Sequence, residues 1–299
     1  MGGIGRAVVA VPGSMHTAGP VLSLLAQKRL LFFVGKGGVG KSTVTVNVSV
    51  ALKQLGYAVG LMDADIYGPN IPMMIGVAKE PVKEGEKILP AEGQGIKVIS
   101  MGFFVPEDTP VVWRGPMVHS AIQQFFRDVV WGELDYLLID LPPGTGDVPL
   151  TLSQLVPLTG AITVTTPQEV ALQDVRKGMM MFKKVNVPLL GVIENMSYFV
   201  CGHCGEHTEI FSTGGGERAA QKFEIPFLGR VPIDPAIREG GDQGNPIVSN
   251  DPYSPQAQAF LQIAKTLAAN IEQAEKGNGD AAPSVSSLLK KITDPLKKS

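Results

Sequence analysis

Cysteine is scarce in this sequence: Cys201 and Cys204 are the only two in 299 residues. So few thiols exclude a disulfide-stapled secreted scaffold and favour a reducing compartment. A surplus of charge is missing too, since 26 Lys and Arg residues oppose 28 Asp and Glu residues. Broad nucleic-acid-binding surfaces need surplus positive charge, so we expect no nucleic-acid partner.

Long apolar runs are absent as well. No stretch approaches the ~20 residues with which a helix spans a bilayer. Residues 1–27 hold one Lys or Arg residue, Arg6, which suits neither a secretory signal nor an Arg-rich transit peptide. These absences predict a cytoplasmic protein whose residues 1–27 form a flexible leader.

The C-terminal residues 275–299 are rich in Gly, Asn, Asp, Pro, Ser and Lys, a composition typical of a flexible tail. Four apolar residues between 288 and 296 have near-helical spacing beside lysines, as in some membrane-anchoring tails. Pro295 interrupts that helix, and its apolar face is short. We therefore expect a solvated tail and no stable membrane association.

The sequence does contain a regular alternation of short apolar runs and longer helical segments. The runs are continuously apolar, which is typical of parallel strands covered on both faces. This order predicts a single α/β domain over 28–274, with a mostly parallel sheet flanked by helices on both faces. The expected strands are 30–34, 58–62, 96–101, 136–139, 161–165, 189–193 and 227–231. The expected helices are 41–55, 117–130, 148–155, 172–184, 216–222 and 254–274.

A glycine-rich loop follows the first expected strand and opens the first expected helix. Its sequence matches G-x-x-x-x-G-K-[ST], the phosphate-binding P-loop motif, in the context that the motif requires. Glycines let backbone N–H groups curl around phosphate oxygens, and the helix N-terminus adds partial positive charge. Lys41 is expected to reach the β- and γ-phosphates, and Ser42 to bind Mg²⁺. The expected nucleotide contacts are Gly35, Gly37, Gly38, Val39, Gly40, Lys41, Ser42 and Thr43.

The loop carries a second lysine, Lys36, five residues before Lys41. The stretch K-G-G-V-G-K-S-T resembles the deviant Walker A signature of the family of nitrogenase iron protein, the MinD and ParA partition ATPases, and the Mrp/ApbC scaffold proteins. The resemblance implies that Lys36 reaches across a homodimer interface to the partner's nucleotide. Lys36 and Lys41 are then both expected to act in ATP hydrolysis, which would be slow and dimer-dependent.

Carboxylates follow two of the expected strands. Asp63 and Asp65 come directly after 58–62, and two residues of extended chain point them to the same side. Asp140 ends 136–139 at the Walker B position, where a carboxylate binds Mg²⁺ directly or through water. The resemblance implies that Asp63 holds a Mg²⁺-bound water and that Asp65 orients the attacking water. The alternative for Asp63 and Asp65 is a pair of solvated loop acids.

Two further positions belong to the expected nucleotide site. Asn195 ends the strand 189–193, and an amide offers a donor and an acceptor to an adenine edge. The resemblance assigns this asparagine to adenine. The backbone near Pro232, after the last expected strand, is expected to line the same base pocket.

The two cysteines form a C-x-x-C motif, with His203 and His207 close by. A structural zinc site needs four ligands, so zinc would have to recruit the histidines. A redox dithiol belongs at the start of a helix in a thioredoxin-like unit, which is not expected here. The third alternative is an iron–sulfur cluster shared across a two-fold axis, with Cys201 and Cys204 from each subunit.

The resemblance to the Mrp/ApbC branch extends over about residues 29–270. It is carried by "DADIYGPNIPMM", "VVWRGPM", "LDYLLIDLPPGTGDV", "TTPQEVALQDVRKG" and "ENMSYFVC". The implied function is a homodimeric ATPase that uses ATP and Mg²⁺, carries a bridging 4Fe–4S cluster and transfers it to apo iron–sulfur client proteins. The alternative is a MinD/ParA-like positioning ATPase whose C-x-x-C holds zinc or nothing.

Overall fold

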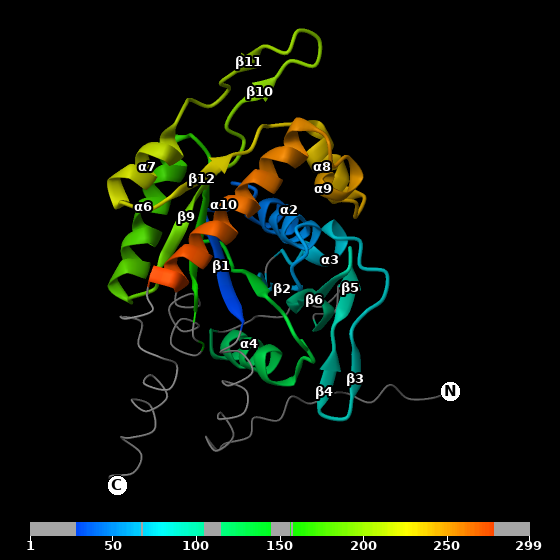
Figure 1. Cartoon of the computed structure of the whole chain (residues 1–299). Helices are drawn as coiled ribbons and strands as arrows, with labels where there is room; N and C mark the ends of the chain where they lie inside the picture. The colour runs from blue at the N-terminus through cyan, green and yellow to red at the C-terminus, as the bar shows by residue number, and fades with distance from the viewer. Residues whose placement is uncertain (1–27, 67, 105–114, 145–155, 157, 278–299) are drawn as a thin grey trace.

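An eight-stranded sheet forms the centre of the protein (Figure 1). The computed structural model describes residues 28–66, 68–104, 115–144, 156 and 158–277. The strand order is β12-β9-β8-β1-β7-β2-β6-β5, and all pairs are parallel except β5 with β6. The strands are β1 (Arg29–Gly35), β2 (Val59–Asp63), β5 (Ala91–Gly93), β6 (Ile96–Ser100), β7 (Tyr136–Asp140), β8 (Gly160–Thr165), β9 (Leu189–Glu194) and β12 (Phe227–Arg230).

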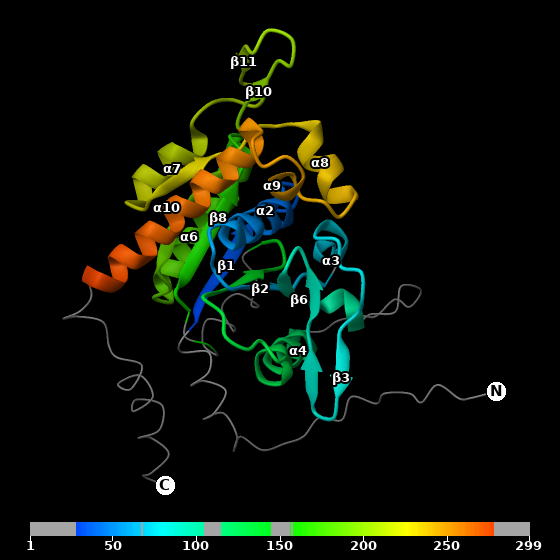
Figure 2. The same ribbon diagram turned by 45° about the vertical axis from the view of Figure 1, so that its right-hand side comes forward.

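Helices cover both faces of this sheet, as Figure 2 shows. One face packs against α2 (Lys41–Gln54) and α10 (Pro255–Gly277), and the other against α4 (Gly115–Asp128) and α6 (Glu169–Lys184). The two faces of β1 alternate between these cores, with Leu31 and Phe33 facing α2 and Leu30 and Phe32 facing α4. Burial on both faces explains why the strand reads as a continuous apolar run.

Smaller elements complete the described chain. Two antiparallel hairpins pair β3 (Val82–Glu84) with β4 (Lys87–Leu89), and β10 (Phe199–Val200) with β11 (His207–Thr208). The β10–β11 hairpin projects from the body in both ribbon views (Figures 1 and 2). The remaining elements are α3 (Ile71–Met74), the 3₁₀ helix η1 (Met101–Phe104), α7 (Gly215–Phe223), α8 (Pro235–Asp242) and α9 (Ile247–Asn250).

The structure confirms the α/β architecture and each of the seven expected strands, to within two residues at either end. The expected helix 148–155, the leader 1–27 and most of the tail lie outside the described residues. The last expected helix continues to Gly277, because Glu275 belongs to α10 and forms an ion pair with Arg29 at the start of β1. No helix within the described part of the chain is long and apolar enough to cross a membrane.

Candidate nucleotide and cluster sites

The loop between β1 and α2 is shaped as an anion cradle. Gly38 and Gly40 have φ values of 85° and 74°, a left-handed conformation that glycine adopts without strain. No side chain caps the N-terminus of α2, and the first helical bond runs from the Val44 N–H to the Gly40 carbonyl. The N–H groups of the first turn therefore point toward the cradle without a cap, which is the arrangement that binds phosphate.

Lys41 points its ammonium group into the buried end of this cradle. Its Nζ atom lies 2.6 Å from Oδ1 of Asp140, with side-chain exposures of 5% and 0%. The ammonium is not aligned for a hydrogen bond with any acceptor among the residues that the structure describes. The ion pair therefore offsets the buried charge while its donors stay unused, which suits a group that meets phosphate oxygens.

Asp140 accepts hydrogen bonds from two hydroxyl groups in addition to its ion pair with the Lys41 ammonium. Ser42 Oγ donates to its Oδ2 at 2.6 Å, and Thr45 Oγ1 donates to its Oδ1 at 3.0 Å. The structure thus brings Ser42 and Asp140, 98 residues apart in the chain, into direct contact. A hydroxyl and a carboxylate are the hard oxygen ligands that Mg²⁺ prefers, so this pair fits a magnesium site.

Asp63 lies beside Asp140 because β2 and β7 pair in register at these two residues. Its carboxylate is fully buried and accepts hydrogen bonds from Ser100 Oγ at 2.9 Å and from the Asp65 N–H at 3.1 Å. Burial, reinforced by the negative charge of Asp140, raises the pKa of Asp63 to about 8. A cation placed between the two carboxylates would relieve this penalty, which supports the expected magnesium role.

Asp65 is 9% exposed and follows Asp63 at the carboxyl edge of the sheet. It is therefore not the solvated loop acid that the alternative described.

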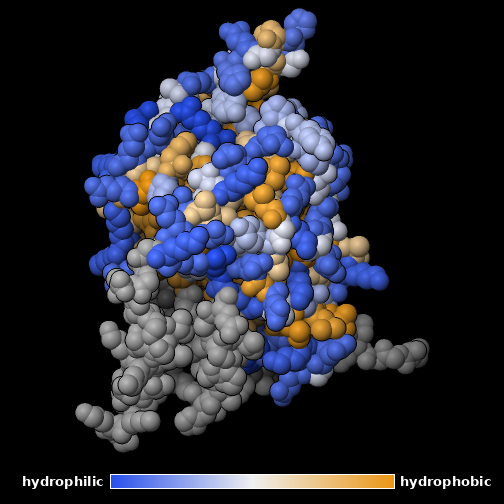
Figure 3. All heavy atoms as spheres, viewed as in Figure 1, coloured by the Kyte–Doolittle hydropathy of each residue, from blue (hydrophilic) through white to orange (hydrophobic). Residues whose placement is uncertain are grey.

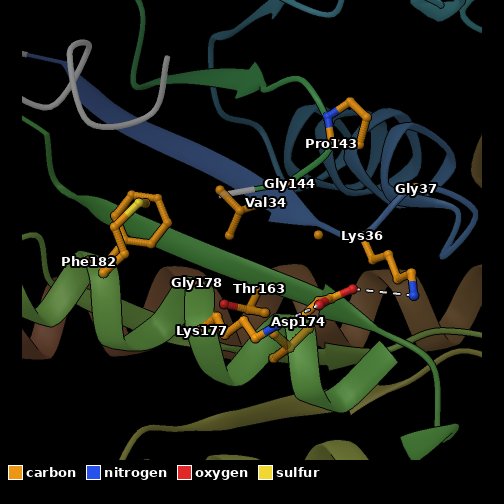
Figure 4. Close-up of a pocket in the computed structure, with 13 residues that line it drawn as sticks. Val34, Lys36, Gly37, Pro143, Gly144, Thr163, Asp174, Lys177, Gly178 and Phe182 are labelled. Atoms are coloured by element: carbon orange, nitrogen blue, oxygen red, sulfur yellow. Dashed lines mark ion pairs between the residues drawn. The ribbon is translucent and has the colours of Figure 1, made fainter. Parts of the chain in front are cut away.

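Lys36 has a different ion-pair partner from Lys41. Its Nζ atom forms an ion pair with Oδ2 of Asp174 on α6 at 3.3 Å, and Lys177 lies 3.7 Å from the other oxygen. In Figure 4 Lys36 extends from the loop toward Asp174, along one wall of a cavity of about 460 Å³. In the single chain, Lys36 is thus held by its own α6. Sequence analysis gave Asp174 no role, although this residue lies within the quoted stretch "TTPQEVALQDVRKG".

The same cavity contains a polar group that the sequence also did not reveal. Thr163, on β8, is 2% exposed, and its Oγ1 has no hydrogen-bond partner within the described residues. Figure 4 shows it near Lys177 and Asp174, with Phe182 farther along the wall. The cavity, which adjoins the phosphate loop, is thus lined by apolar and charged side chains together with this hydroxyl group.

Asn195 contacts the phosphate loop directly. Its Nδ2 donates to the Val39 carbonyl at 2.8 Å, and its N–H donates to the Thr165 carbonyl at 2.7 Å. A Cβ atom at Gly40 would lie 2.4 Å from this Nδ2, so only glycine permits the approach. Pro232 is buried and next to Val231, whose carbonyl accepts from Ser197 N–H. Through Ser197, two residues after Asn195, the structure thus connects the segment of Asn195 to the segment of Pro232.

The C-x-x-C motif occupies the turn of the projecting β10–β11 hairpin. Cys201 is partly exposed and Cys204 is exposed. The backbone N–H groups of Cys204 and His203, followed by the Cys204 side chain, lower the pKa of the Cys201 thiol. Polar and apolar side chains both line this projection (Figure 3). The thiols are thus accessible, and the lowered pKa shifts Cys201 toward the thiolate form that binds metal.

The histidines do not complete a metal site with these thiols. His207 stacks on Tyr198, with ring centroids 4.9 Å apart and planes 12° apart. Within the described part of the chain, no three Cys, His, Asp or Glu residues are grouped so that they could hold a metal ion. A structural zinc site formed by one chain needs four such ligands, so the observed geometry does not fit it.

Comparison with known proteins agrees with this geometry. The ParA group model described as "NUBPL iron-transfer P-loop NTPase" matches residues 26–268. The chain belongs to this iron-transfer P-loop NTPase family. The match spans the phosphate loop, both carboxylate strands and the cysteine hairpin.

Members of the iron-transfer family from distant organisms resemble the chain closely. An iron-sulfur cluster carrier protein of Synechocystis is 52% identical over 246 residues, which are 80% of this chain and 70% of that protein. One from Methanocaldococcus jannaschii is 51% identical and covers 82% of this chain and 85% of its own. The iron-sulfur cluster transfer protein NUBPL of Dictyostelium discoideum is 51% identical, with coverages of 82% and 76%.

Solved structures place the iron-transfer family among nucleotide-binding proteins. A nucleotide-binding protein from Archaeoglobus fulgidus in complex with ADP is 38% identical and aligns with a TM-score of 0.70, covering 82% of this chain and 97% of that one. The cell-division ATPase MinD of Pyrococcus furiosus is 26% identical with a TM-score of 0.59, covering 81% and 98%. The α/β P-loop NTPase architecture and the family expected from the signature are both confirmed.

Proposed function

We propose that this protein is an ATP-hydrolysing iron–sulfur cluster carrier that works as a homodimer in the cytoplasm. The observation that carries the proposal is the pair of thiols in the turn of a projecting hairpin, one partly exposed and one exposed, without a third ligand nearby in the described chain. The names of the relatives, iron-sulfur cluster carrier and transfer proteins, support the same cargo.

The cluster is the cargo, and its size and ligand requirement imply a dimer. A 4Fe–4S cluster takes four thiolates, and one hairpin supplies two. A second copy of the same hairpin across a two-fold axis supplies the other two, because an isologous contact brings the same loop to both sides. Surface exposure of the hairpin leaves the cluster within reach of an apo-protein, to which it would be transferred.

ATP binds in the cradle of the phosphate loop. Gly35, Gly37, Gly38, Val39 and Gly40 shape the cradle, Thr43 continues it into α2, and Asn195 with the backbone near Pro232 holds the base. Ser42, Asp140 and Asp63 would hold Mg²⁺, which would supply positive charge close to the phosphates.

Hydrolysis requires positioning more than covalent chemistry. Lys41 stabilises the transferred phosphoryl group, and Asp65 orients the attacking water. Lys36 of the partner subunit supplies further positive charge to the phosphates. Because one lysine comes from the other chain, turnover is slow and depends on dimerisation.

Anaerobic reconstitution with iron and sulfide tests the cargo. We expect Cys201→Ala and Cys204→Ala to lose the broad absorbance near ~400 nm that clusters show, while His203→Ala keeps it. The wild type should hold about four iron and four sulfide per two chains. A full cluster on a monomer would refute the bridging proposal, and stoichiometric zinc that iron does not displace would favour a MinD/ParA-like positioning ATPase.

A further inference from the structure

The phosphate loop and the cysteine hairpin are joined by one side chain, Asn195. Its amide touches the loop, since Nδ2 donates to the Val39 carbonyl at 2.8 Å and lies against Gly40. Six residues after Asn195 the chain reaches Cys201. A change in the position of the Asn195 amide is therefore passed to the residues that lead into the hairpin, which we call the hairpin root (residues 194–198).

The segment between Asn195 and Cys201 is held along its length. The Ser197 N–H donates to the Val231 carbonyl at 2.9 Å, and the Ile233 N–H donates to the Tyr198 carbonyl at 2.8 Å. Phe199 forms a parallel bridge with Ile233, and the Cys201 N–H donates to the Glu206 carbonyl at 2.9 Å. So many backbone bonds make this segment a stiff connector rather than a slack linker.

The buried carboxylate of Glu194 also holds this hairpin root in place. Glu194 is fully buried, and its Oε1 and Oε2 accept from Ser197 Oγ and the Gly216 N–H, each at 2.6 Å. Two residues on, Met196 has φ 52°, a left-handed conformation that costs a non-glycine residue free energy. The turn between Asn195 and Ser197 is thus held by its surroundings rather than by its own preference.

We propose that Asn195 couples nucleotide binding to the mobility of the cysteine hairpin, and we call this residue the joint between the two sites. The bond to Val39 uses one of its two amide hydrogens, so its oxygen and the second hydrogen remain available for a base. A bound base adds contacts to a side chain that already holds the phosphate loop, and this fixes the hairpin root more tightly. Nucleotide binding then reduces the motion of the Cys201–Cys204 turn. This inference rests on the proposed nucleotide site.

The two native cysteines report on the hairpin directly, since the chain has no others. The experiment measures the rate at which the reduced, cluster-free full-length protein reacts with the thiol reagent dithiobis-nitrobenzoate, with and without saturating ADP and Mg²⁺. We expect ADP to slow the reaction by about fivefold, the equivalent of one hydrogen bond's net ~1 kcal/mol. An unchanged or faster rate at saturating ADP would overturn the inference.

Two variants separate the joint from other causes. Asn195→Asp keeps an acceptor but cannot donate to the Val39 carbonyl, and Asn195→Ala removes both functions. Without ADP, the thiols of both variants should react faster with the reagent than those of the wild type. Saturating ADP should no longer slow the reaction of either variant. If slowing survives in Asn195→Ala, the hairpins are shielded by dimer contact instead, and the joint is refuted. Light scattering of the same samples reports the dimer independently.

Direct titration with ADP keeps the two proposals distinguishable. If ADP binds the wild type and the thiol rate does not change, the joint is wrong while the nucleotide site stands. If ADP does not bind the wild type at all, the proposed nucleotide function fails. Thermal unfolding of each variant checks that it is folded.

Discussion

The Nζ atom of Lys36 lies 3.3 Å from Oδ2 of Asp174, which ties the outer lysine of the phosphate loop to helix α6 of the same chain. Both side chains are more than a third exposed, so solvent screens the pair and it contributes at most ~1 kcal/mol. The lysine that we propose to reach a second subunit is therefore held by its own chain, but only weakly.

Asp174→Asn should release this lysine. The expected result is a rise of up to about fivefold in the dimer-dependent ATPase rate, because up to ~1 kcal/mol of competing attraction is removed. Turnover is measured against protein concentration. The matched control is Glu169→Gln, which removes a carboxylate from the same helix that pairs with Arg176 instead. Equal effects of the two variants would show that only the net charge of α6 matters.

Lys41→Ala and Lys36→Ala should differ in nucleotide binding. Loss of the buried Lys41 ammonium removes a charge-assisted contact with phosphate and should weaken ADP binding by at least about tenfold. Lys36→Ala should change the affinity of the monomer by no more than about twofold, because its charge is screened and directed at Asp174. Calorimetric titration with ADP and Mg²⁺ measures both. Comparable losses in the two variants would contradict the division of roles.

Asp65→Asn should separate binding from hydrolysis. If Asp65 orients the attacking water, its amide variant should bind ATP and Mg²⁺ normally while turnover falls by ~10²-fold. Single-turnover hydrolysis together with nucleotide affinity measures the two effects. Near-normal turnover would show that the buried position of Asp65 has a structural purpose only.

The pKa of Asp63 predicts how stability depends on pH. Burial and the nearby Asp140 raise this pKa from its usual 3.8 to about 8 in the folded protein without Mg²⁺. Between about pH 4 and pH 8, the unfolded chain has released the proton while the folded protein keeps it. The folded state thus binds more protons, and the free energy of unfolding falls as the pH rises through this window.

Asp63→Asn removes that titration. The free energy of unfolding of the variant minus that of the wild type should therefore increase from pH 5 to pH 8 and level off above pH 8. The amide itself adds a constant to this difference and does not change its dependence on pH. Chemical denaturation at several pH values in the absence of Mg²⁺ measures the difference. Asp251→Asn, at an exposed carboxylate before α10, is the control and should show no such increase.

Several features of the protein follow from local sequence alone. The glycines and lysines of 35–42 specify a phosphate loop because backbone conformation and helix start are encoded within a few residues. The seven strands were predictable because most of their successive residues are apolar, as burial on both faces of a parallel sheet requires. The short hairpins and the helices α3, α8 and α9 were missed, since they are too short to show a period.

Contacts between distant parts of the chain were decided only by the tertiary structure. The register of β2 with β7 puts Asp63 beside Asp140, and this proximity, with burial, raises the pKa of Asp63. The Lys36–Asp174 pair and the contact of Asn195 with Val39 likewise depend on which strands are neighbours and where each strand ends. The sequence states which chemical groups are present. Strand order and register determine which of them meet, because a pair far apart in the chain leaves no local pattern.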